Sequence, residues 1–159
     1  MADELIESEH TVFLQTTGKF FNKNAEEGIV STIWNFPVRG HLWKIQRFAF
    51  DNRTGDFATV DERGQIYWYS MKHNIYSLIK KAAAPVVALD FAPANARQLI
   101  ISYQNGAILL LDIDSKSIIS NIPHLTSMEH MTPTLICSHM KSAVSAVAYD
   151  DTITLWNMK

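Results

Sequence analysis

Three segments of the chain align with one another at a spacing of 42 to 45 residues, and this repeat constrains the fold more than any other feature. The segments are centred on Ile66, Ile108 and Ile153. In each of them a polar turn leads into an apolar strand that ends beside a small polar residue. A period of about 40 to 45 residues built from short strands is typical of the blades of a β-propeller. The repeat therefore predicts an all-β protein made of equivalent small sheets.

Two stretches, 41–81 and 85–122, each have room for four antiparallel strands. β-Branched and aromatic residues alternate in them with turns rich in Gly, Asn, Asp and Lys, which is the pattern expected of strands and hairpins. The expected strands are 45–50, 57–60, 65–71 and 75–80 in the first stretch, and 86–91, 99–103, 107–113 and 118–122 in the second.

Two glycine turns separate predicted strands, and the one at Asn105-Gly106 fixes the strand register of its own stretch in this prediction. Gly64 follows Arg63, and Gly106 follows Asn105, at matching places in the repeat. An Asn-Gly pair is favoured in a type I′ hairpin, because both central residues of that turn need positive φ. We therefore expect a two-residue type I′ turn at Asn105-Gly106.

The third stretch, 134–159, can be divided in two ways. Either 134–138 is its first strand and 143–149 its second, or 144–148 is its first strand and about ten residues of the second are missing. Before it, residues 123–133 form a longer connection that departs from the repeat, as loops often do. Residues 1–28 are expected to be a flexible or edge segment, and the incomplete propeller region is expected over 29–159, beginning with a strand at 29–34.

The sequence thus predicts two full four-stranded blades, one incomplete blade and an extra N-terminal strand. A propeller closes with about four to eight blades, so this number leaves sheet faces and edges open. We expect the chain to be a fragment or short form of a longer propeller, or to associate with itself or another protein through its open blade edges.

Parts of the repeat resemble the WD40 repeat family. Gly40-His41 matches the start of a repeat in that family, and Asp150 with Thr152 to Trp156 matches its ending. In that family a His, a turn Asp and a strand Trp belong to one buried hydrogen-bonded set. The resemblance assigns these roles singly to His41, Asp150 and Trp156. Blades one and two depart from the pattern, with other residues at the turn and Trp positions: Arg63 and Asn105, and Tyr69 and Leu111.

Other short segments resemble the N-terminal region of WD-repeat proteins that end in a TBC domain. They are Gly18 to Phe21, Gly28 to Val30, Arg47 to Asp51 and Gly64 to Tyr67. Such proteins resemble Rab GTPase-activating proteins and are associated with centrosomes, centriolar satellites and cilia. The resemblance implies a regulatory WD region acting at the centrosome or the ciliary base. A TBC domain does not fit in 159 residues, so its catalytic chemistry does not carry over.

No pattern in the sequence indicates an enzyme, a cofactor or a metal site. The pairs Asp112/Asp114 and Asp150/Asp151 lie at strand ends or turns, where Asp serves local hydrogen bonds. The chain has no Walker loop and no nucleophile elbow. Four residues of the types that bind zinc fall within sixteen positions but lack the paired spacing of a structural zinc site; they are His124, His130, Cys137 and His139.

Composition and charge limit which partners and which cellular compartment we expect for this chain. The formal charge is −2, with 14 basic and 16 acidic residues, which offers no field for nucleic acid. No apolar run reaches the 18 residues of a membrane span, and the acidic start does not read as a secretory or mitochondrial signal. A single Cys fits a reducing compartment. We therefore expect a cytoplasmic protein that binds other proteins.

The aromatic run Tyr67-Trp68-Tyr69 is the strongest candidate for a partner surface. Because side chains alternate along a strand, Tyr67 and Tyr69 share one face and Trp68 shares the other with Ile66. If one face stays uncovered, it offers Tyr and Trp anchors to a partner; the alternative is burial of both faces between blades. The function expected is a non-catalytic scaffold or docking module. A small closed β-sandwich with a ligand pocket remains a further alternative.

Overall fold

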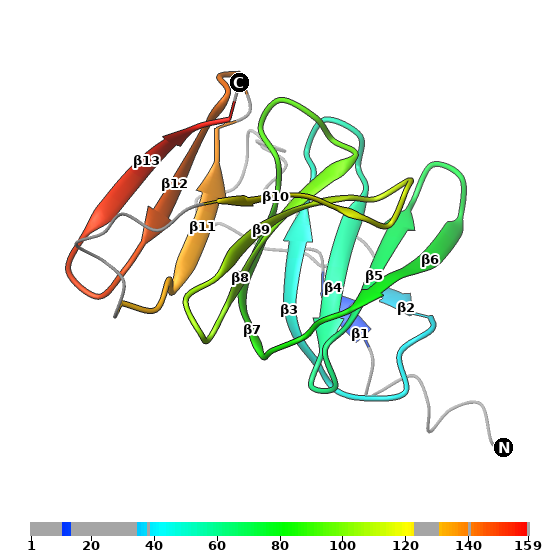
Figure 1. Ribbon diagram of the computed structural model, residues 1–159. Helices are drawn as coiled ribbons and strands as arrows, with labels where there is room; N and C mark the ends of the chain where they lie inside the picture. The colour runs from blue at the N-terminus through cyan, green and yellow to red at the C-terminus, as the bar shows by residue number, and fades with distance from the viewer. Residues whose placement is uncertain (1–10, 14–34, 38, 123–130, 140, 159) are drawn as a thin grey trace, which may run out of the picture.

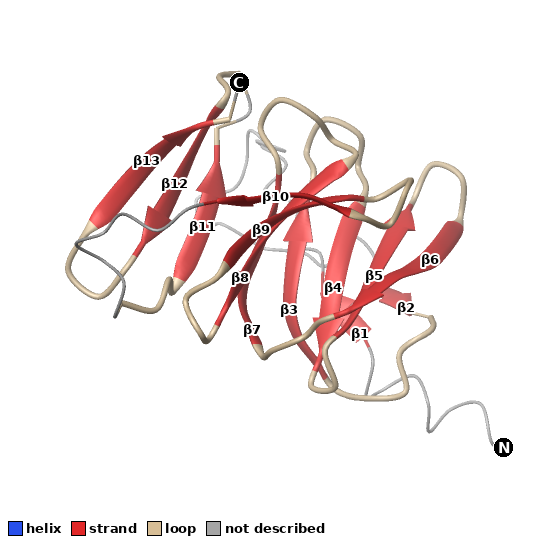
Figure 2. Cartoon of the chain, viewed as in Figure 1, coloured by secondary structure: helices blue, strands red, loops and turns tan. Residues whose placement is uncertain are grey.

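The computed structural model describes residues 11–13, 35–37, 39–122, 131–139 and 141–158. Over these residues the chain is all-β and folds as a partial, open β-propeller of two four-stranded sheets and one three-stranded sheet (Figures 1 and 2). A separate pair of short antiparallel strands, β1 (Thr11–Phe13) and β2 (Asn35–Pro37), precedes them. The predicted fold class is confirmed.

Sheet one contains β3 (Ile45–Phe50), β4 (Phe57–Asp61), β5 (Gln65–Ser70) and β6 (Ile75–Lys81). Sheet two contains β7 (Val86–Phe91), β8 (Gln98–Tyr103), β9 (Ile108–Asp112) and β10 (Ile118–Ile122). In both sheets each strand pairs antiparallel with the next one in sequence. All eight strands coincide with the predicted ones to within a residue or two at each end.

Sheet three contains β11 (Leu135–Ser138), β12 (Val144–Ala148) and β13 (Ile153–Asn157), in that order. This arrangement decides between the two divisions of residues 134–159. The first strand is 135–138 and the second is 144–148, so the second strand is present. In the described part of the chain sheet three lacks only the outer, fourth strand of the repeat.

The three sheets stand face to face, with their first strands β3, β7 and β11 next to one another. Two cross-links tie these first strands together. Arg47 Nε donates to the carbonyl oxygen of Val87 at 2.7 Å, and the Ser138 amide donates to Asp90 Oδ2 at 2.6 Å. The arrangement is the one that blades have around a propeller axis.

Apolar cores fill the spaces between successive sheets. Ile66, Trp68 and Val60 of sheet one pack with Leu89, Phe91, Leu99 and other residues of sheet two. The other face of sheet two packs against sheet three through a second core: Ala88, Ala92, Ile100, Ile108, Ile136, Val147 and Tyr149. Each fully buried Leu, Ile, Val or Phe side chain stabilises the fold by about 1.5 to 3 kcal/mol. The first core joins sheet one to sheet two, and the second joins sheet two to sheet three, so sheets that are neighbours in the sequence are also neighbours in space.

The backbone of the turns repeats with the same period as the sequence. Gly64 and Gly106, 42 positions apart, have φ values of 76° and 86°. In the next turn of each sheet, Asn74 and Lys116, also 42 positions apart, have φ values of 50° and 57°. Equivalent positive-φ residues show that sheets one and two are built by the same local rules.

The type I′ turn expected at Asn105-Gly106 is wrong. Gly106 has positive φ but Asn105 does not. The Gly106 amide donates to the Tyr103 carbonyl oxygen at 2.9 Å, and the Tyr103 amide donates to the Ala107 carbonyl oxygen at 2.9 Å. The loop therefore has three residues, with the Gly in the left-handed position after a tight turn, which is the next most common hairpin type.

Some predictions fall outside the described residues. These are the strand expected at 29–34, the N-terminal segment apart from 11–13, and the positions of His124 and His130. In the part of the chain that the structure describes, no helix is long and apolar enough to cross a membrane.

Candidate functional site

The outer face of sheet three is apolar and uncovered. The strand register aligns Leu135, Ala148 and Ile153 in one row across the sheet, and Cys137, Ala146 and Leu155 in the next. Directly opposite residues of antiparallel strands lie on the same face, so these six side chains form one surface, which we call the open face. Leu135, Ile153 and Leu155 are exposed by 61%, 69% and 73%.

Equivalent positions in the other two sheets are covered. Ile66 and Ile108, which correspond to Ile153 in the repeat, are only 0% and 1% exposed. Trp68, which corresponds to Leu155, is 7% exposed. In sheets one and two this face packs against the following sheet. For the residues that the structure describes, the open face is therefore an inter-sheet contact surface without a neighbouring sheet.

Sheet three also leaves a strand edge open. Its order is β11-β12-β13, and within the described residues no strand pairs with the outer side of β13. In sheets one and two the third strand has a fourth strand, β6 or β10, on that side. An unpaired edge presents free backbone N–H and C=O groups that can pair with another chain. The open face and the edge of β13 form one continuous candidate docking site.

A buried hydrogen-bonded set in sheet one includes one of the predicted residues. His41 Nδ1 lies 2.8 Å from Asp61 Oδ2, and His41 Nε2 lies 2.6 Å from Thr59 Oγ1. Asp61 Oδ1 also accepts the amides of Arg63 and Gln65 at 3.0 and 2.9 Å. The set links the chain that enters sheet one to the β4–β5 turn.

In sheet one the acid that binds His41 is Asp61, a residue to which the resemblance gave no role. Asp150 lies exposed in the hairpin between β12 and β13. The resemblance places the turn position at Arg63, directly before Gly64, whereas Asp61 lies three positions before that glycine. An Asp placed so that its side chain accepts two turn amides was the available signal.

Trp156 lies in sheet three, away from the His41 set. Its Nε1 donates to Thr154 Oγ1 at 2.9 Å within β13, and its ring packs against the core between sheets two and three. Gly40, the remaining predicted repeat position, has φ of 96° and lies close to Tyr67 and Tyr76. A Cβ at Gly40 would lie 2.7 Å from Tyr67 Cε1.

The aromatic run does not form an exposed partner surface, because all three side chains are buried. Tyr67, Trp68 and Tyr69 are exposed by only 9%, 7% and 2%. Their predicted division between two faces is confirmed, since Ile66 and Trp68 pack toward sheet two while Tyr67 and Tyr69 belong to a separate cluster with Phe57. Tyr69 also donates its hydroxyl to the Arg39 carbonyl oxygen at 2.5 Å. Burial raises the pKa of the Tyr69 phenol well above its usual value.

Two of the four residues of zinc-binding types are described by the structure, one in β11 and one directly after it. Cys137 is exposed on the open face, and His139 Nδ1 lies 2.8 Å from Ser142 Oγ. Across the described ranges no group of three or more His, Cys, Asp or Glu side chains is placed to hold a metal ion.

Comparison with protein-family models finds no match for this chain, and comparison with curated proteins finds no similar sequence. The candidate site therefore rests on the geometry of sheet three alone.

Proposed function

We propose that the protein is a non-catalytic docking module, and that the open face of sheet three binds an antiparallel β-sheet of another protein. The observation that carries this proposal is the contrast between Ile153, 69% exposed, and its buried equivalents Ile66 and Ile108. The site has the shape and chemistry of the contact that joins sheet one to sheet two.

The choice of occupant follows from that established contact. Wherever the repeat covers this face, the covering element is a small antiparallel sheet with its own apolar face. The open face continues this series at its uncovered end. A partner that supplies a β-sheet in the place of a following blade would reproduce the same packing.

The size of the surface indicates how much the partner must contact. Burying Leu135, Ile153 and Leu155, each already about one-third covered, would contribute about 3 to 6 kcal/mol in total. Association costs an estimated 4 kcal/mol or more in lost freedom. The apolar face alone is therefore insufficient, and we expect the partner also to pair with the free edge of β13.

The buried His41, Asp61 and Thr59 set supports a place for this chain among WD40-like repeats, since a buried His and a turn Asp meet in one blade. The narrower proposal, a regulatory region of a TBC-domain protein at the centrosome or cilium, is supported only by the short sequence resemblances given above. Proximity labelling in cells from the tagged chain tests it: enrichment of centrosomal or ciliary proteins is expected, and a purely cytosolic background would contradict it.

Site-specific photo-crosslinking tests the docking proposal. A benzophenone amino acid replaces Thr152, which is exposed beside the open face in the β12–β13 hairpin, and the cross-linked peptides are identified by mass spectrometry. We expect peptides from strands of a β-sheet in another protein. Leu155→Lys should abolish the cross-link, because it places a charge in the apolar contact.

The matched control is Ile75→Lys, which adds the same charge at an exposed Ile of sheet one and should leave the cross-link intact. Peptides from helices, or loss of the cross-link in both variants, would contradict the proposal. Light scattering of the purified protein completes the test. A dimer that Leu155→Lys dissociates would show that a second copy, and not another protein, covers the face.

A further inference from the structure

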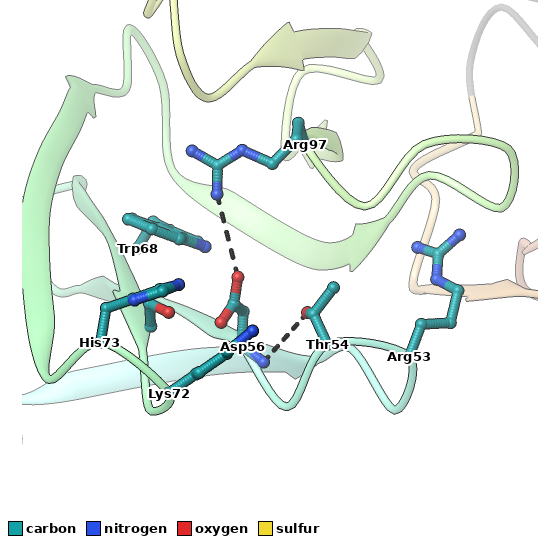
Figure 3. A pocket seen from close by; sticks show the side chains of 8 residues that line it. Arg53, Thr54, Asp56, Trp68, Lys72, His73 and Arg97 are labelled. Carbon is teal, nitrogen blue, oxygen red and sulfur yellow. Dashed lines mark hydrogen bonds and ion pairs between the residues drawn. The ribbon is translucent and has the colours of Figure 1, made fainter.

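A second candidate site lies between sheets one and two, away from the open face. A cavity of about 560 Å³ opens where the β3–β4 loop, the β5–β6 turn and the β7–β8 loop meet (Figure 3). Three cationic side chains and one carboxylate line it together with four other residues: Arg53, Lys72 and Arg97, Asp56, and Thr54, Trp68, Ser70 and His73.

The indole nitrogen of Trp68 is the most informative atom of this cavity. Trp68 is 7% exposed, and its Nε1 is buried without a hydrogen-bond partner. The guanidinium of Arg97 lies over the ring, 4.2 Å from its centroid, and Figure 3 shows the nitrogen-bearing edge turned toward the side where Asp56 lies. Buried polar groups are nearly always paired. An indole N–H can only donate, so its missing partner is an acceptor.

The cationic side chains around the cavity differ in whether they already have hydrogen-bond and ion-pair partners. Arg53 is held by Asp51 Oδ1 at 2.7 Å and by the carbonyl oxygens of Pro93 and Ala92. Arg97 pairs closely with Asp114, and this hydrogen bond raises the pKa of the guanidinium.

Lys72 differs from these two arginines. It lies exposed in the β5–β6 turn, and no ion pair joins it to any described carboxylate. The lining of the cavity thus includes the ammonium of Lys72, which has no described ion pair, and the indole N–H of Trp68, which has no described acceptor.

We propose that this cavity binds a carboxylate side chain of an acidic peptide. The carboxylate would accept the Trp68 N–H and lie beside the Lys72 ammonium, and the neighbouring His73 offers a further ring nitrogen. Charge-assisted hydrogen bonds of this kind are stronger than neutral ones. The site is separate from the open face, so it extends the proposed docking function without depending on it.

The carboxylate inside the cavity determines which anion fits. Asp56 is 6% exposed, and its Oδ2 lies 3.8 Å from Arg97 Nη1. A doubly charged phosphate would meet more repulsion from this buried acid than a singly charged carboxylate would. Asp56 therefore favours an acidic peptide over a phosphopeptide.

Binding is measured by fluorescence anisotropy with a labelled hexapeptide of alternating Glu and Gly, and with its Gln and phosphoserine counterparts. We expect the Glu peptide to bind most tightly. Lys72→Gln should weaken its binding by up to about fivefold, the range of a solvent-exposed ion pair. The matched control Lys141→Gln, at an exposed Lys between β11 and β12, should leave binding unchanged.

Nuclear magnetic resonance observes the indole N–H of Trp68 directly. In a ¹⁵N–¹H spectrum of the full chain, the indole signal of Trp68, assigned with Trp68→Phe, should shift on adding the Glu peptide, while that of Trp43 should not. Equal binding of the Glu and Gln peptides, tighter binding of the phosphoserine peptide, or an unmoved Trp68 signal would overturn the proposal. None of these outcomes bears on the open face, because the photo-crosslinking test does not involve this cavity.

Discussion

His41 Nδ1 lies 2.8 Å from Asp61 Oδ2, and both side chains are completely inaccessible to solvent. The two residues are twenty positions apart, one before β3 and the other at the end of β4. Thr59 Oγ1 lies 2.6 Å from the second ring nitrogen, His41 Nε2, so both nitrogens of the imidazole have a hydrogen-bond partner. The contact fixes where the chain enters sheet one.

Removing either partner should be strongly destabilising. His41→Ala removes a hydrogen-bond partner from two buried side chains, Asp61 and Thr59, and leaving a buried polar group short of a partner costs about 1 to 3 kcal/mol. Urea unfolding at pH 7 measures the loss. The control is Asp150→Asn, which changes an exposed turn Asp and should cost no more than about 0.5 kcal/mol. Similar losses in both variants would show that the buried pair contributes nothing special.

Gly40 and Gly55 make a matched test of close packing. Both have positive φ, 96° and 75°, so Ala at either site costs about 1 to 2 kcal/mol in backbone strain. Only at Gly40 does the added Cβ meet neighbours, at 2.7 Å from Tyr67 and 2.9 Å from Tyr76, whereas nothing lies within 4 Å at Gly55. We expect Gly40→Ala to lose a further 1 to 3 kcal/mol or so in thermal or urea unfolding. Equal losses would contradict the close approach.

Asp90 should make stability depend on pH. Burial is the main cause that raises the pKa of this carboxyl above its usual value, and the Ser138 amide opposes the shift. The folded state therefore holds the proton more tightly than the unfolded state, so this residue favours folding at acid pH and loses that contribution as pH rises through its raised pKa. Asp90→Asn keeps an oxygen for Ser138 and removes the titration.

The free energy of unfolding of both proteins is measured by urea titration at several pH values above 3.8, the usual pKa of the carboxyl. As pH rises, the Asn variant should become increasingly more stable than the native protein. Asp114→Asn is the opposite case. The hydrogen bond from Arg97 lowers the pKa of Asp114 below its usual value of 3.8, so the native contribution is present above that value and lost as pH falls below it. This variant is therefore also measured at pH values below 3.8. The same sign of pH dependence in both variants would refute the assignment for Asp90.

The three equivalent isoleucines should respond differently to truncation. Ile66→Ala and Ile108→Ala remove buried side chains, and each should cost about 2 to 5 kcal/mol. Ile153→Ala removes a side chain that is 69% exposed, and it should stay within about 0.5 kcal/mol in the isolated protein. A large loss from Ile153→Ala would show that something in solution already covers the open face.

Most of the architecture could be predicted because the determining signals are local. The alternation around Ile66 and Ile108 and the turns at Gly64 and Gly106 give the strands and their order, and a repeat of known period gives the arrangement of sheets. The incomplete third sheet was expected as well. What remained open was which strand it lacks, because the apolar residues of 134–148 fit two registers until the contact of β11 with β7 selects one.

The sites were less predictable because they depend on contacts between distant segments. The burial of Tyr67 and Tyr69 depends on what covers the outer face of sheet one, which alternation along β5 does not reveal. The pairing of His41 with Asp61 needs the segment before β3 to meet the end of β4. The cavity beside Trp68 gathers side chains from three loops of two sheets, and nothing in the local pattern of any of these loops predicts it.

Among the described residues, sheet two has a neighbouring sheet on both faces, whereas sheet three has one on a single face and no strand paired to the outer side of β13. In an array whose units contact only their neighbours, stability is a sum of nearest-neighbour terms, so β13 should open before any strand of sheet two and exchange its amide hydrogens fastest. A partner seated there would slow that exchange in proportion to its occupancy. The last strand of the chain would then report whether the protein is alone or bound.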